Sequence, residues 1–276
     1  MPDFLQALLL GVIEGITEFL PISSTGHLLI AERWLGHRSD LFNIAIQAGA
    51  ILAVVAIYRE RIVQLVAAMF GRGTADVHGQ PAREYGLKLA LAFLVTAVLG
   101  LIAKKLGFEL PETVTPVALA LIIGAVWMLV AEYLAARRAA AIGERTIITW
   151  PVALLVGIAQ VAAGVFPGTS RSAATIFVAL LAGTTWRPAA TEFAFLVGIP
   201  TMFAATGYEL LHVLKDGGAA GEDWTALAIA FVVSMVTAFI AVKWLLRYIQ
   251  THRFTAFAVY RLVLGVALLA LLPQGG

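Results

Sequence analysis

Two glutamates four residues apart are the first residues in this sequence that could do chemistry. Glu14 and Glu18 lie in an otherwise apolar stretch, and on a helix their spacing places both carboxylates on one face. Like charges at this spacing repel each other and are costly in an apolar region, so protonation, an arginine or a cation must compensate. One interpretation is a carboxylate at the membrane interface beside a neutral one. The other is a pair of oxygen ligands for Mg²⁺ or Ca²⁺, with water or phosphate oxygens completing the coordination.

A run of hydroxyl residues follows the acidic pair. The segment PISSTGH (21–27) contains Ser23, Ser24 and Thr25. At the start of a second short helix, such residues are ordinary N-caps. His27 comes three residues after Ser24, about one helical turn along, where its ring can approach the hydroxyl. Because a serine beside an imidazole is the minimal activated nucleophile, the segment is open to two interpretations, capping and catalysis.

A second hydroxyl-rich segment, PGTSRS (167–172), carries an arginine. Gly168 permits close approach of the backbone, and Ser170 and Ser172 supply hydroxyls. Arg171 is the main indication of function, because an arginine at membrane depth needs a permanent anionic partner. Its planar fork matches phosphate oxygens in a way that lysine does not. The structural alternative is a salt bridge to one of the two glutamates, and both can hold in turn if substrate loosens the bridge.

The composition defines the environment of these residues. Of the 276 residues, 61% are hydrophobic and 13% charged, whereas soluble domains are about 45–50% apolar and 25% charged. The sequence therefore predicts a polytopic membrane protein. The net charge of +2, spread over short loops, indicates no nucleic-acid partner. The absence of cysteine excludes disulfides, thiolate nucleophiles and cysteine–zinc sites. Residues 1–20 lack a basic segment and a cleavage site, so we expect mature protein there and not a signal peptide.

Six stretches are long and apolar enough to cross the hydrocarbon as helices, namely 42–58, 85–107, 112–134, 190–212, 224–248 and 255–272. Two further apolar regions cover residues 4–35 and 149–183. Pro21 interrupts the first and Pro167 the second, and a helix should stop or kink at such a proline. Each remaining piece is too short to span alone, so both regions are predicted to be re-entrant helix–loop–helix hairpins. Irregular backbone at that depth must be buried in protein or line a wet cavity.

The two broken regions resemble each other at an offset of 146 residues. Setting GVIEGITEFLPISST above GIAQVAAGVFPGTSR pairs Gly11 with Gly157, Glu14 with Gln160, Pro21 with Pro167 and Ser24 with Ser170. Three spans follow each hairpin, and because three is odd the second half must enter from the opposite face. The predicted fold is a single all-α integral membrane domain (1–276) of two inverted-topology repeats, about 1–135 and 148–276, with six spans and four half-helices. Chance similarity of short apolar motifs is the alternative.

Basic residues in alternate loops predict the orientation. One side holds Arg59, Arg61, Arg72, Arg83, Arg137, Arg138, Arg145, Arg187, Lys243, Arg247 and Arg253. The other side holds Arg33, Arg38, Lys104, Lys105 and Lys215. The positive-inside rule places the first set in the cytoplasm. Both termini and the mouth of the first hairpin are then expected outside, and the second hairpin enters from the cytoplasm.

Taken together, the motifs resemble a known family. E-x-x-x-E followed by FLPISSTGH, with PGTSRS about 146 residues later, is similar to the undecaprenyl-diphosphate phosphatases, also called the bacitracin-resistance proteins. The likeness covers nearly the whole chain, including the segment counts and the terminal FxxYR. It implies hydrolysis of undecaprenyl diphosphate to the monophosphate and phosphate, which recycles the cell-wall carrier lipid in the bacterial cytoplasmic (inner) membrane. It also implies a divalent-metal requirement and an active site open to the periplasm.

By position, the resemblance assigns Glu14, Glu18, Ser24, Thr25 and His27 to the first motif and Ser170, Arg171, Ser172 and Thr175 to the second. One departure is Ala173, where the usual second motif has glycine; its methyl group bears on loop packing and leaves the hydroxyls and the arginine intact.

As a mechanism, we expect the two glutamates to hold a divalent cation, Mg²⁺ or Ca²⁺, on the diphosphate while Arg171 binds the same group. The other substrate-binding residues are expected to be Ser23, Thr25, Gly168, Ser170, Ser172 and Thr175. Ser24 is the expected nucleophile with His27 as its base. Direct attack by His27, or by a water on the cation, is an alternative. The prenyl tail should lie in an apolar groove between spans that is open to the bilayer.

An ion-coupled secondary transporter is the competing function, because inverted repeats, broken helices and midplane carboxylates are typical of that class too. An arginine among hydroxyls, opposite Ser24 and His27, favours the phosphatase. A lipid flippase using the same cavity is a third reading. The expected partners are a polyprenyl diphosphate and membrane lipid, and a homodimer is left open.

Overall fold

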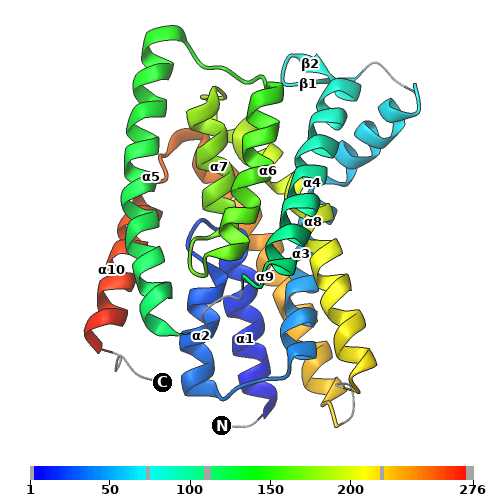
Figure 1. Cartoon of the computed structure of the whole chain (residues 1–276), viewed down its shortest axis with the longest axis vertical. Helices are drawn as coiled ribbons and strands as arrows, with labels where there is room; N and C mark the ends of the chain where they lie inside the picture. Colours follow the sequence, from blue (N-terminus) through cyan, green and yellow to red (C-terminus); the bar gives the residue numbers. More distant parts are fainter. Residues whose placement is uncertain (1–2, 73–74, 109–112, 218–220, 272–276) are drawn as a thin grey trace.

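The computed structural model describes residues 3–72, 75–108, 113–217 and 221–271, and nearly all of their regular structure is helical. In chain order the elements are α1 (Asp3–Thr17), α2 (Ser24–Leu35), α3 (Asp40–Met69), β1 (Asp76–Val77), β2 (Gln80–Pro81), α4 (Ala82–Lys105), α5 (Val114–Ile142), α6 (Trp150–Val165), α7 (Arg171–Ala182), α8 (Arg187–Lys215), α9 (Trp224–Thr251) and α10 (Thr255–Leu271) (Figure 1). The two strands form one short antiparallel hairpin. The prediction of an all-α protein is confirmed.

Among the described residues, five helices are long and apolar enough to cross a membrane, and they correspond to five of the six predicted spans: α3, α4, α5, α8 and α9. The sixth predicted span is α10, whose 17 residues are at the lower limit for a spanning helix. The chain is therefore a polytopic membrane protein. Some helices run past the predicted ends, since α3 continues to Met69 and α5 to Ile142. Hydropathy marks where a helix leaves the hydrocarbon, whereas the helix itself continues.

Both proline-broken regions form a pair of short helices joined by a loop. Residues 18–23 separate α1 from α2, and residues 166–170 separate α6 from α7. Pro21 and Pro167 lie in these loops, as expected for a residue that cannot donate a helical hydrogen bond. The four helices have 15, 12, 16 and 12 residues, each too short to cross the hydrocarbon.

The two loops end in the same unusual backbone conformation. Ser23 (φ 74°) and Ser170 (φ 66°) are the N-caps of α2 and α7, and each side chain accepts a bond from the amide three residues on. A positive φ is uncommon for a residue with a side chain. The predicted alignment set Ser24 against Ser170, and this detail is wrong. The first loop has one residue more than the second, so Ser23 is the counterpart of Ser170 and Ser24 that of Arg171.

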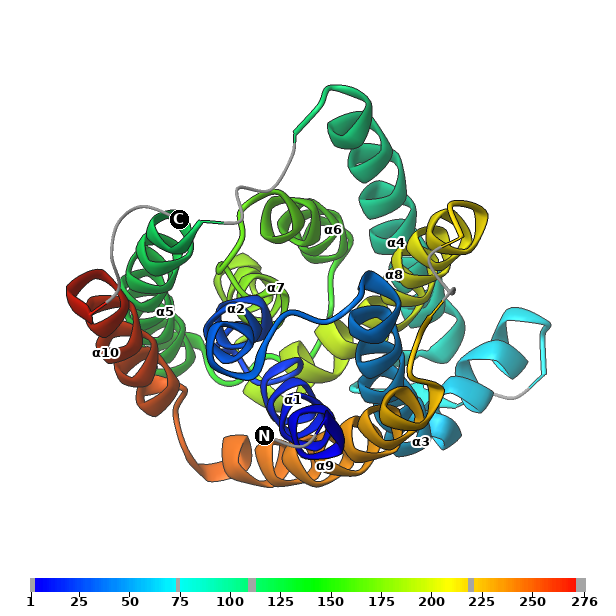
Figure 2. The ribbon, with the colours of Figure 1, turned by 90° about the horizontal axis from the view of Figure 1, so that it is seen from below.

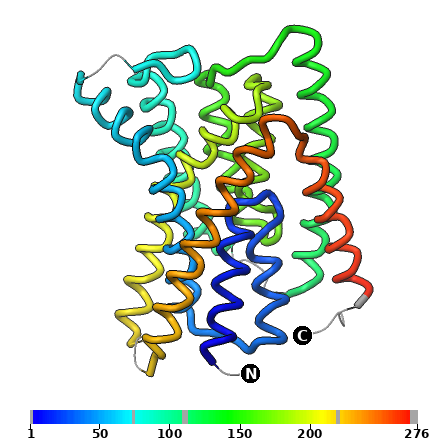
Figure 3. The backbone as a smooth tube through the Cα atoms, turned by 180° about the vertical axis from the view of Figure 1, so that it is seen from behind, coloured from blue at the N-terminus to red at the C-terminus, as the bar shows by residue number. Residues whose placement is uncertain are grey.

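The helices are arranged so that the two loops meet inside the molecule. Figure 1 shows α1 beginning and α10 ending at the same end of the molecule, with α6 and α7 in the other half. Figure 2, seen from below, places α2 and α7 together near the centre of the bundle. In Figure 3 the ascending α9 lies beside α1, and the two helices pack against each other. The side chains of α7 are buried along nearly its whole length. Its first residue, Arg171, therefore lies in the interior of the protein.

Candidate active site

An ion pair joins the tips of the two helix pairs. The guanidinium Nη2 of Arg171, the first residue of α7, donates to Oε1 of Glu18, which directly follows α1. The Glu18 side chain is 3% exposed and that of Arg171 30%. The predicted meeting of the acidic motif with the guanidinium is therefore present, in the form of the salt bridge foreseen as the structural alternative.

Ser24 completes the contacts of this carboxylate. Its Oγ donates to Oε2 of Glu18, so the two carboxylate oxygens take one partner from each helix pair. A carboxylate within hydrogen-bond reach of a hydroxyl is placed to accept its proton. The hydrogen-bond acceptor of the Ser24 hydroxyl is therefore Glu18 and not His27.

The predicted pairing of His27 with Ser24 is wrong. Nδ1 of His27 lies 2.7 Å from the Ser23 carbonyl oxygen and Nε2 lies 2.7 Å from the Tyr260 hydroxyl. A carbonyl only accepts, so Nδ1 carries the hydrogen and donates it, and Nε2 accepts from Tyr260. The two rings also stack, with centroids 5.6 Å apart. Both ring nitrogens are occupied, and the imidazole is not available to Ser24.

Glu14 lies one helical turn before Glu18 and is fully buried. Within the part of the chain that the structure describes, neither of its carboxylate oxygens accepts a hydrogen bond from a donor, and its charged neighbours are Glu18 and Arg171. A buried carboxylate without a partner is unfavourable unless a proton or a cation compensates it. No cluster of three His, Asp or Glu side chains occurs among the described residues. Glu14 and Glu18 alone would leave most coordination positions of a divalent cation to water or phosphate oxygens.

The remaining predicted residues divide into two groups. Ser172 Oγ donates to the Leu20 carbonyl (3.0 Å) and Thr175 Oγ1 to the Arg171 carbonyl (2.8 Å). Both hydroxyls therefore bind backbone at the loops that join the short helices. Neither lines the central pocket. Those that do are Glu18, Ser23, Ser24, Thr25, Gly168, Ser170 and Arg171.

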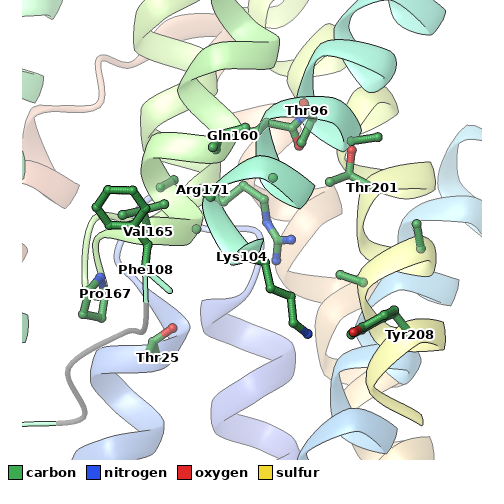
Figure 4. Close-up of a pocket in the computed structure, with 18 of the residues that line it drawn as sticks. Thr25, Thr96, Lys104, Phe108, Gln160, Val165, Pro167, Arg171, Thr201 and Tyr208 are labelled. Carbon is green, nitrogen blue, oxygen red and sulfur yellow. The ribbon is translucent and has the colours of Figure 1, made fainter. Parts of the chain in front are cut away.

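The central pocket has a volume of about 750 Å³, and α4, α6 and α8 supply much of its lining. Its walls include apolar residues such as Phe93, Leu101 and Val161. Figure 4 shows Arg171 reaching into it and Lys104 extending toward Tyr208. The ammonium of Lys104 lies 3.8 Å from the centre of that ring. Lys104 is expected from the sequence to be a loop charge, but its side chain lines the pocket.

Arg261 of α10 is a second residue whose partners the sequence does not predict. Its side chain is fully buried and donates to backbone carbonyls of both loops, Pro21 in the first and Gly168 and Thr169 in the second. An arginine inside an apolar helix was a signal, because such a charge is costly without partners. Carbonyl partners carry no residue-type pattern, so the sequence could not name them.

These features define a class of protein: a polytopic membrane protein with an intramembrane pocket where a carboxylate, a hydroxyl and a guanidinium converge. The family model described as "Bacitracin resistance protein BacA" matches residues 7–267. The chain belongs to this family.

Relatives match over almost their whole length. A Rhizobium etli protein named undecaprenyl-diphosphatase is 67% identical over 99% of this chain and 98% of its own. A protein of the same name from Rhizobium johnstonii is 67% identical, and one from Xanthomonas euvesicatoria is 59% identical, with the same coverage of both chains.

Proposed function

We propose that this protein is a hydrolase that converts undecaprenyl diphosphate to undecaprenyl phosphate and inorganic phosphate in the bacterial inner membrane. This activity recycles the carrier lipid of cell-wall synthesis and confers bacitracin resistance. The observation that carries the proposal is the convergence of Ser24 and Arg171 on Glu18 inside the pocket. The names of the relatives support the same activity and favour it over a transporter or a flippase.

In the proposed mechanism, the terminal phosphate of the substrate takes over the guanidinium of Arg171 and releases Oε1 of Glu18. The planar fork suits two phosphate oxygens at once. Ser24 Oγ attacks the terminal phosphorus as Oε2 of Glu18 accepts its proton. The new Oγ–P bond replaces the bond to the bridging oxygen, undecaprenyl phosphate leaves, and water then frees Ser24 by hydrolysis. A divalent cation held by Glu14 and Glu18 would neutralise charge on the phosphoryl oxygens.

The apolar side of the pocket is proposed to take the prenyl tail. Phe93, Leu101 and Val161 belong to α4 and α6, and the pocket continues between these helices and α8. Leu101 is also an exposed side chain. A chain that enters between α4 and α6 would therefore leave its diphosphate at Arg171.

The finer topology is proposed as one domain of two inverted repeats with six spans. Two glycine contacts support it, because they mirror each other between the halves. A Cβ on Gly11 of α1 would lie 2.6 Å from the Ala230 carbonyl oxygen of α9, and one on Gly157 of α6 would lie 2.7 Å from that of Ala92 in α4. Each helix pair thus packs on the second long helix of the other half. The positive-inside rule then places the pocket mouth and both termini on the periplasmic side.

Purified protein in detergent is expected to release phosphate from undecaprenyl diphosphate, and EDTA is expected to abolish the release. Added Mg²⁺ or Ca²⁺ should restore it. Malachite-green detection of phosphate, with undecaprenyl monophosphate as the control substrate, makes the measurement. Equal rates with and without chelator would exclude the cation, and no release in any buffer would exclude the proposed reaction.

Ser24→Ala is expected to lower turnover by at least about 100-fold, because it removes the hydroxyl that Glu18 activates. Thr225→Ala on α9 is the matched control: it removes an exposed hydroxyl that lies outside the pocket, and it should leave the rate close to that of the wild type. Acid-quenched single turnovers with terminally ³²P-labelled substrate should retain label on the wild type and not on the variant. Full activity of Ser24→Ala would remove Ser24 from the mechanism.

A further inference from the structure

The guanidinium of Arg261 makes a larger set of contacts than any other described arginine. It donates to five backbone carbonyls: Pro21 (3.4 Å), Gly168 (3.0 Å), Thr169 (3.0 Å), Ala120 (3.1 Å) and Leu121 (3.5 Å). Guanidinium N–H groups form a rigid fork, so these partners have fixed positions relative to one another. Pro21 belongs to the first loop, Gly168 and Thr169 to the second, and the remaining pair to α5. One side chain of α10 thus ties both loops to α5.

The preceding residue holds the first loop at another point. The Tyr260 hydroxyl donates to Nε2 of His27, whose Nδ1 donates to the Ser23 carbonyl. Ser23 is the residue with positive φ directly before Ser24. Its backbone conformation is unfavourable for a serine unless surrounding contacts impose it. Tyr260 therefore acts through His27 on the peptide unit that aims the Ser24 hydroxyl.

We propose that Tyr260 and Arg261 are positioning residues for phosphoryl transfer. This inference rests on the proposed function. The two residues hold the two loops, 18–23 and 166–170, in the relative position that lets Ser24 and Arg171 meet on Glu18. Neither residue lines the central pocket, so neither acts on the substrate directly. In this proposal His27 is also a positioning residue, because it links Tyr260 to the Ser23 carbonyl, and it is not the base. Phosphoryl transfer depends on positioning and charge, so a small displacement of one tip should lower turnover more than binding.

A glycine in α5 allows Arg261 to be displaced without being replaced. A Cβ on Gly124 would lie 2.3 Å from Nη2 and 3.0 Å from Cζ of Arg261. Gly124→Ala must therefore push the guanidinium away from its carbonyls. Gly265 provides a matched control in the same helix pair: its Cβ would lie 2.7 Å from Ile122 Cγ1 and 2.9 Å from the Ala118 carbonyl oxygen. It disturbs the packing of α5 on α10 through atoms other than the guanidinium, including Leu121 Cβ at 3.2 Å.

The test is a double-mutant cycle on Arg261→Lys and Gly124→Ala. Each single change is expected to lower kcat by about 100-fold, the typical cost of misplacing reacting groups by about 1 Å, while KM changes little. The double variant should be no worse than Arg261→Lys alone, because lysine lacks the atoms that the new methyl group strikes. The effect of Gly265→Ala should instead add to that of Arg261→Lys. Arg253→Lys, in the segment between α9 and α10, should resemble the wild type.

The smaller change Tyr260→Phe removes one hydroxyl. It is expected to lower kcat with KM unchanged, whereas Tyr248→Phe on α9 should have no effect. All rates are measured well below each variant's melting temperature, so that a loss of stability alone does not appear as a loss of kcat. Arg261→Lys with a lower Tm but wild-type kcat, or additive effects of Arg261→Lys and Gly124→Ala, would overturn the proposal.

A second readout does not depend on turnover. The chain has no cysteine, so spin labels on Thr25→Cys and Thr169→Cys report the distance between the two tips without background labelling. The distance distribution should broaden in Arg261→Lys and Gly124→Ala and stay narrow in Gly265→Ala. Equal distributions in all four proteins would overturn the inference. Absence of phosphate release by the wild type would instead count against the proposed function.

Discussion

Arg171→Lys is expected to lower the turnover of undecaprenyl diphosphate by at least about 100-fold, the usual cost of removing one preorganised donor from a reaction centre. Because lysine keeps the positive charge, the fall in turnover measures the contribution of the planar guanidinium geometry alone. A single ammonium cannot engage two phosphate oxygens in the planar, bidentate manner of a guanidinium. The measurement is phosphate release under single-turnover conditions, with Tm recorded for the same preparation.

The Arg171–Glu18 ion pair makes stability the main confounding effect. Glu18 is nearly fully buried, and weakening the partner of a buried charge is strongly destabilising in general. A second buried pair in the chain, Arg187 with Glu132, provides the control. Its side-chain exposures, 22% and 4%, resemble the 30% and 3% of the first pair, and Arg187 Nε donates over 2.7 Å.

Arg187→Lys is accordingly expected to lower Tm by a similar amount while leaving turnover of the folded protein unchanged, because this pair lies outside the pocket. Parallel losses of turnover in both variants would mean that the first ion pair only supports the fold. Wild-type turnover in Arg171→Lys would show that phosphate binding needs charge and not the fork.

The sequence predicts the helices well because two strong signals coincide. Long apolar runs mark the spans, and Pro21 and Pro167 mark the breaks, since proline excludes a continuous helix at those points. The same pattern predicts that two polar loops face each other, because buried irregular backbone needs a shared polar environment. The contact between Glu18 and Arg171 follows from this, although they are 153 residues apart.

The internal geometry of the tips is less accessible to sequence reasoning. His27 was predicted to turn toward Ser24 because the two are one helical turn apart. In the structure its ring bonds the carbonyl of Ser23, four residues back, and the hydroxyl of Tyr260. The positive φ of Ser23 determines where that carbonyl points, and no residue type announces such an angle on a serine. The loop 18–23 is one residue longer than the loop 166–170. This difference was not predicted either, because it too depends on the backbone angles at the end of each loop.

Glu14→Gln tests a buried carboxylate to which the described residues supply no hydrogen-bond donor. If Glu14 and Glu18 hold a divalent cation, this isosteric change removes a charged oxygen ligand. The cation concentration for half-maximal activity should then rise by at least about tenfold, in the range seen when groups around a metal are altered. Titration of Mg²⁺ in the phosphate-release assay measures this shift, and the stabilisation of Tm by Mg²⁺ measures binding without turnover. Glu209→Gln, which alters another carboxylate lining the pocket, should change neither quantity.

The same substitution separates the two ways in which a buried carboxylate can be compensated. A protonated glutamic acid is neutral, and glutamine is close to it in shape and charge, so a Glu14 that merely carries a proton should tolerate the change. A Glu14 that binds a cation should not, because an amide oxygen is a weaker ligand for a hard ion. Wild-type rates and wild-type Mg²⁺ dependence in Glu14→Gln would therefore assign a proton to Glu14, and would leave Glu18 as the one glutamate of the pair in contact with the substrate.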